Sequence, residues 1–107
     1  MDDVKHFISS ILKDMLDEIR GAEKYYDMAK SSTGIELRKM FIEMAHQELG
    51  HYDHLCETLR EKMRAHPTEV TVENNIIAKT LFEDMKSWKE HLHGKIKAFA
   101  EENGIRF

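Results

Sequence analysis

Apolar residues recur along this chain at steps of three and four, the spacing of one side of an α-helix. In a first stretch, about residues 3–30, they are Ile8, Leu12, Met15, Ile19, Ala22, Tyr26 and Ala29. In a second, about residues 35–64, they are Leu37, Phe41, Met44, Leu55 and Leu59. In a third, about residues 73–102, they are Ala78, Leu81, Met85, Trp88, Leu92 and Phe99. The pattern predicts three long helices, each with one buried apolar stripe.

Short breaks separate the predicted helices. The segment 31–34, Ser-Ser-Thr-Gly, favours caps and turns, so the first two helices should form an antiparallel hairpin. Pro67 should end the second helix, because proline cannot continue one. Asn103-Gly104 is a favourable end for the third. At 107 residues, the whole chain, 1–107, is predicted to be a single all-α domain.

Composition narrows the functional classes. The formal net charge of −4 argues against a nucleic-acid binder, which needs a basic surface to neutralise phosphates. One cysteine, Cys56, excludes an intramolecular disulfide and suits a reducing compartment. The N-terminus lacks the basic and apolar regions of a signal peptide, and no apolar run could span a membrane. We therefore expect a cytoplasmic protein without nucleic-acid or membrane partners.

Two polar residues interrupt the apolar stripe of the second helix. Steps of four and three from Met44 lead to Glu48 and His51 before the stripe returns to Leu55. A buried, unpaired charge is costly, and a metal ion would compensate for it. Glu and His three residues apart lie on one side of a helix and can converge on one cation. Oxygen and nitrogen donors suit iron or manganese, whereas the absence of thiolates argues against structural zinc.

The first helix offers a matching carboxylate. Glu18 lies beside Met15, Ile19 and Ala22, on the predicted buried side. In a hairpin that turns near residue 33, Glu18 lies roughly fifteen residues before the turn and Glu48 roughly fifteen after it. At ~1.5 Å per residue, both are about 22 Å from the turn. The two carboxylates are therefore expected to face each other.

These residues resemble a known superfamily, the rubrerythrin and ferritin-like di-iron proteins. The resemblance lies in Glu18 with Ala22, Tyr25 and Ala29, followed by Glu48-Leu-Gly-His51. In that superfamily two helices each give a Glu, and two others each give Glu-x-x-His. The resemblance implies that Glu48 bridges two irons and that Glu18 and His51 are terminal ligands. Tyr25 and Tyr52 are expected to support these ligands without binding the metal.

The chain carries only half of that ligand set. A second copy could supply the other half through a two-fold axis, so that two hairpins form a four-helix bundle. Short encapsulated ferritins are built in this way, and the resemblance to them implies a homodimer and makes an encapsulin shell a candidate partner. A second Glu-x-x-His, Glu90 to His93, is an alternative source of ligands. On the stripe through Met85, Trp88 and Leu92, however, Glu90 falls on the solvent side.

The predicted activity is ferroxidase-type oxidation of Fe(II) by dioxygen or peroxide, with Glu18, Glu48 and His51 as the catalytic residues. Two alternatives remain open. One is rubrerythrin-like reduction of peroxide with electrons from a separate donor. The other is a metal-free helical dimer or partner-binding module, in which the polar residues fix the register of the helices.

Overall fold

Three long helices make up the part of the chain that the structure describes, and no strand occurs there. They are α1 (Asp2–Ser31), α2 (Ile35–Ala65) and α3 (Val72–Glu102). The computed structural model describes residues 2–66 and 72–107, with side chains at 6–66 and 79–107, so Pro67 and the side chain of Ala78 lie outside it. The all-helical prediction is confirmed, and each helix end lies within one residue of its predicted position.

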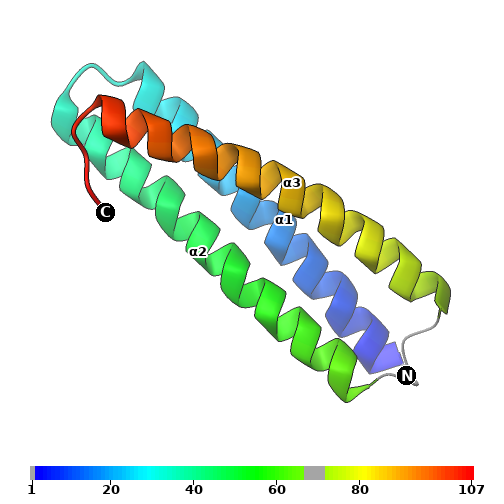
Figure 1. The fold of residues 1–107 in the computed structure, drawn as a ribbon. Helices are drawn as coiled ribbons and strands as arrows, with labels where there is room; N and C mark the ends of the chain where they lie inside the picture. The colour runs from blue at the N-terminus through cyan, green and yellow to red at the C-terminus, as the bar shows by residue number, and fades with distance from the viewer. Residues whose placement is uncertain (1, 67–71) are drawn as a thin grey trace.

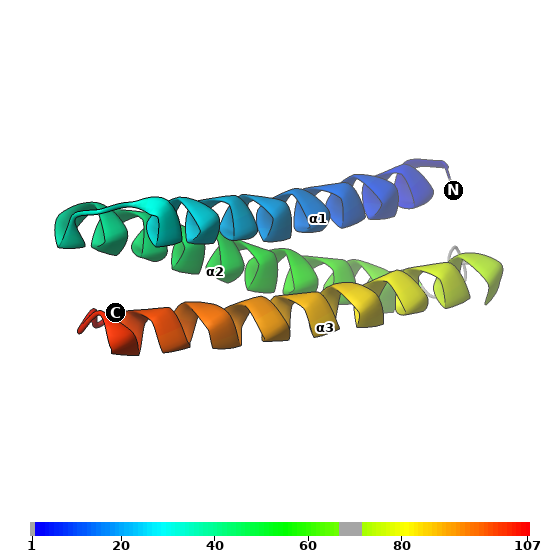
Figure 2. The same cartoon turned by 90° about the horizontal axis from the view of Figure 1, so that it is seen from above.

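The helices lie side by side in a rod measuring 52 × 20 × 19 Å. The first two run antiparallel, and α3 runs back beside them, antiparallel to α2 (Figure 1). Contacts between α1 and α2 are by far the most extensive, whereas α3 touches each of them less. Seen from above, the three helices extend alongside one another (Figure 2). Within the described residues, none of the helices has the length and apolar character needed to cross a membrane.

Local hydrogen bonds explain where the helices end. The Ser32 hydroxyl donates to the Met28 carbonyl at 2.7 Å, which satisfies one of the last carbonyls of α1. At the end of α3, Gly104 has a φ of 67°, and the Ile105 N–H donates to the Ala100 carbonyl at 2.8 Å. This is a Schellman motif, and it confirms Asn103-Gly104 as the helix stop.

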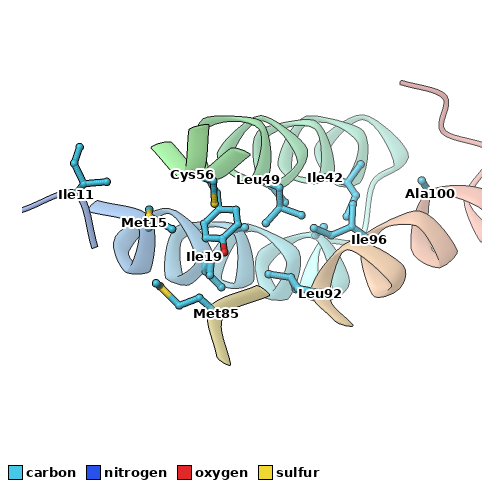
Figure 3. Close-up of a cluster of buried hydrophobic side chains, with 14 of the residues drawn as sticks. Ile11, Met15, Ile19, Ile42, Leu49, Cys56, Met85, Leu92, Ile96 and Ala100 are labelled. Carbon is cyan, nitrogen blue, oxygen red and sulfur yellow. The ribbon is translucent and has the colours of Figure 1, made fainter. Parts of the chain in front are cut away.

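A core of buried apolar side chains runs along the rod (Figure 3). From α1 it includes four residues of the predicted stripe, Met15, Ile19, Ala22 and Ala29. From α3 it includes Met85, Leu92, Ile96 and Ala100, whereas Leu81, predicted to be buried, is 44% exposed. The described residues contain no fully buried charged or polar side chain.

The prediction of the buried stripe of α2 is wrong except for Leu59. The side chains that α2 buries are Ile42, Ala45, Leu49, Tyr52, Cys56 and Leu59. On the predicted stripe, Leu37 is 49% exposed, and Phe41, Met44 and Leu55 are only partly buried. Helix α2 thus carries two neighbouring apolar stripes. The stripe through Ile42 and Leu49 is buried in the core, and the predicted stripe beside it is only partly buried.

Polar contacts hold α3 against one side of the hairpin. The Trp88 indole N–H donates to Glu23 Oε2 of α1 at 3.0 Å. Lys89 Nζ lies 3.3 Å from Asp53 Oδ1 of α2. The side chain of Glu23, although exposed, therefore helps to attach α3 to the hairpin.

Candidate metal site

The structure brings together the three residues that the sequence singles out as metal ligands. Glu18 comes from α1, and Glu48 and His51 come from α2, one turn apart. One ligand atom from each lies within 4.8 Å of the others, and they form the one such cluster of three found among the described residues. His51 Nδ1 lies 3.5 Å from Glu18 Oε2. The expectation that Glu18 and Glu48 meet at equal distance from the turn is confirmed.

The cluster lies at the edge of the helix interface and not in the core. The side chain of Glu18 is 24% exposed and that of His51 is 59% exposed, while Glu48 is partly buried. The reason is that α2 turns Leu49 and Tyr52 into the core, and these residues neighbour Glu48 and His51 in sequence. The expectation that Glu48 and His51 are fully buried is therefore wrong, and what a metal would offset is the close approach of two like charges, Glu18 and Glu48.

Two carboxylates at this distance repel each other unless a proton or a cation lies between them. The nearness of Glu18, which favours a hydrogen bond from the protonated form of Glu48, together with burial and the negative charge of Glu18, raises the pKa of Glu48 from 4.5 to about 7, although His51 opposes the shift. Glu18 Oε2 is buried and has no hydrogen-bond donor among the described residues. A divalent cation fits here, because it would offset the repulsion between the two carboxylates and give this oxygen a partner.

The site opens on the side of the hairpin that faces away from α3. Glu23, which contacts α3, follows Glu18 by five residues and is therefore rotated from it by about 140° around α1. Asp53, the α3 contact of α2, is likewise rotated by about 140° from Glu48. The candidate ligands therefore point away from α3, and the described residues that line the groove beside Glu18 and His51 all belong to α1 and α2.

A groove of about 450 Å³ leads to the cluster. It is lined by Asp14, Asp17, Glu18, His51, His54 and Leu55. Asp14 and Asp17, which the sequence analysis did not single out, lie one turn before and immediately before Glu18. Their exposed carboxylates make the mouth of the site acidic. Spacing along α1 could have revealed them.

The two tyrosines differ in position. Tyr52 is 2% exposed, and burial raises the pKa of its hydroxyl, which has no partner among the described residues. Tyr25 is partly buried and packs against the core. Neither hydroxyl forms a hydrogen bond to a ligand within the described contacts, so their support of the site stays a prediction.

The alternative ligands Glu90 and His93 do not join this cluster. Glu90 lines a separate groove with Tyr52, Cys56 and Lys86. The ring of His93 lies 6.3 Å from that of His46, between α3 and α2. In the described part of the chain, neither residue belongs to a group of three convergent ligands.

Comparison of the chain with models of protein families, with curated proteins and with solved structures gives no match. Support for a function therefore comes from the chemistry and geometry of the residues themselves.

Proposed function

We propose that this chain binds and oxidises Fe(II) at a carboxylate and histidine site shared by two copies. The observation that supports this most directly is the convergence of Glu18, Glu48 and His51 within 4.8 Å. Two carboxylates and an imidazole form a donor set that iron and manganese both accept. The resemblance to rubrerythrin and ferritin-like proteins, carried by the same residues, favours iron.

A second copy is needed because three side chains cannot satisfy two metal ions. The partly exposed stripe of α2 supports a position for it. Leu37, Met44 and Leu55 lie on the same side of the helix as Glu48, and Leu37 is 49% exposed. A two-fold axis through the site would set stripe against stripe and ligands opposite ligands. The two hairpins would then form a four-helix bundle, with each α3 on its outer side.

Iron is the substrate in this proposal. The carboxylates of Glu18 and Glu48 supply negative charge, which stabilises Fe(III) more than Fe(II). Two Fe(II) ions lose one electron each, and dioxygen takes both electrons and two protons to leave as hydrogen peroxide. The acidic groove at Asp14 and Asp17 raises the local concentration of divalent cations. Residence in the cytoplasm or in an encapsulin shell stays a prediction from the sequence.

Anaerobic titration with Fe(II), followed by native mass spectrometry, tests the proposal. We expect one iron per chain in a dimer and, after admission of oxygen, the ultraviolet absorbance of carboxylate-bound Fe(III). Glu48→Gln should abolish both signals. Glu90→Gln is the matched control, because it removes an exposed carboxylate outside the cluster.

Other outcomes would favour the alternatives. A dimer that binds neither Fe(II) nor Mn(II) would favour a metal-free helical module. Iron that is oxidised by peroxide but not by dioxygen, and re-reduced by an added electron donor, would favour peroxide reduction. Two irons bound to a monomer would contradict the shared site.

A further inference from the structure

Gly21 occupies an unfavourable position for a glycine. It lies inside the 30-residue helix α1, where glycine costs about 1 kcal/mol relative to alanine. Its backbone does not need the freedom of glycine, because the one glycine with positive φ in the described chain is Gly104. Some other feature must account for the missing side chain.

The carboxylate of Glu48 occupies the space that a side chain at position 21 would need. A Cβ added to Gly21 would lie 3.1 Å from Glu48 Oε2, 3.5 Å from its Cδ and 3.7 Å from its Cγ. The side chain of Glu48 therefore crosses from α2 and lies directly against the backbone of α1. The added Cβ at Gly50 or Gly94, also inside helices, would meet nothing within 4 Å.

We propose that Gly21 is a positioning residue that seats the Glu48 carboxylate beside Glu18. Gly21 follows Glu18 by three residues, so the two share one side of α1. Contact with the bare backbone lets Glu48 approach Glu18 closely enough for both to reach one cation. This inference rests on the proposed metal-binding function.

The contact is tight enough to matter for metal binding. At 3.1 Å, the Cβ of alanine would require Oε2 to move by a few tenths of an ångström. Ligand geometry must be held to within about 0.5 Å, and a displacement of ~1 Å can cost ~100-fold in function. We expect Gly21→Ala to weaken metal binding by about tenfold, and Gly21→Val to weaken it further.

Co(II) titration of the full chain tests this, because its visible absorption reports both affinity and coordination geometry. Gly21→Ala should bind Co(II) about tenfold more weakly and with an altered spectrum. Its thermal stability without metal should not fall, since alanine favours the helix. Gly50→Ala is the matched control, lies two residues from Glu48, and should bind as the wild type does.

A double substitution separates positioning from a general effect on structure. In Glu48→Asp, the shorter side chain withdraws from position 21, so Gly21→Ala should cost much less affinity there than in the wild type. An equal cost in both backgrounds, or Gly21→Ala binding like Gly50→Ala, would overturn the role of Gly21. Wild-type protein that binds no Co(II), or binds it equally well after Glu48→Gln, would instead refute the metal site itself.

Discussion

Replacing Glu48 by glutamine should stabilise the metal-free protein at neutral and higher pH. Folding raises the pKa of this carboxyl from 4.5 to about 7, chiefly because Glu18 favours a hydrogen bond from its protonated form. A carboxyl group with a raised pKa stabilises the fold fully below the unfolded value, and this contribution is lost as the pH rises through the folded value. The stability of the metal-free wild type should therefore fall from about pH 5 to about pH 8.

The size of the effect follows from the pKa. A rise from 4.5 to about 7 corresponds to at most ~3.4 kcal/mol of unfolding free energy, at ~1.36 kcal/mol per pH unit. Glu48 is partly exposed, so water screens the repulsion, and we expect ~1–2 kcal/mol. Glutamine has the same shape without the charge, and its amide can donate to Glu18. The variant should regain this amount at about pH 8 and gain little at about pH 5.

Urea unfolding followed by circular dichroism measures the difference. Both proteins are studied with a chelator at one protein concentration, because association would add to the apparent stability. Glu57→Gln, which removes an exposed carboxylate elsewhere on α2, controls for net charge. A wild-type unfolding free energy that does not decrease from about pH 5 to 8, or a decrease that persists in Glu48→Gln, would refute the reasoning.

Three further predictions concern the metal, the second copy and the core. A cation must displace the proton of Glu48, so the affinity for Mn(II) measured by calorimetry should be lower at about pH 6 than at about pH 8. Equal affinities at the two pH values would contradict the raised pKa of Glu48. Leu37→Asp should convert a dimer to monomers in sedimentation and lower Fe(II) binding, whereas Leu81→Asp, at a similarly exposed leucine on α3, should do neither. Dimers that persist in Leu37→Asp would place the second copy elsewhere. Leu49→Ala should cost about 2–5 kcal/mol of unfolding free energy, since Leu49 is 2% exposed, and a loss below about 1 kcal/mol would show that the core collapses around it.

The sequence predicts the helices and the meeting of the carboxylates because both depend on local rules. The break at 31–34 and the stop at Asn103-Gly104 set the helix ends, and a constant rise per residue sets the heights of Glu18 and Glu48. The covered side of α2 could not be predicted in the same way. Both of its stripes have helical spacing and apolar residues, so only the packing of the whole core distinguishes buried Leu49 from its partly exposed neighbour Glu48.

The role of Gly21 could not be predicted from the sequence for a related reason. A glycine inside a helical pattern is a signal that something approaches its backbone. The approaching group is Glu48, twenty-seven residues away on another helix, and only the arrangement of the two helices identifies it. Asp14 and Asp17 could have been predicted from the sequence, because Asp14 lies one turn before Glu18 and Asp17 directly before it.

The placement of α3 has a consequence for how this protein can change. The candidate ligands come from α1 and α2, while α3 is attached on another side of the hairpin through Trp88 and Lys89. Substitutions on α3 can therefore strengthen or loosen the hairpin, or create new outer contacts, without reaching the carboxylates. If α1 and α2 bind a metal as proposed, substitutions on α3 could change the stability of the protein while leaving the candidate ligands unaltered.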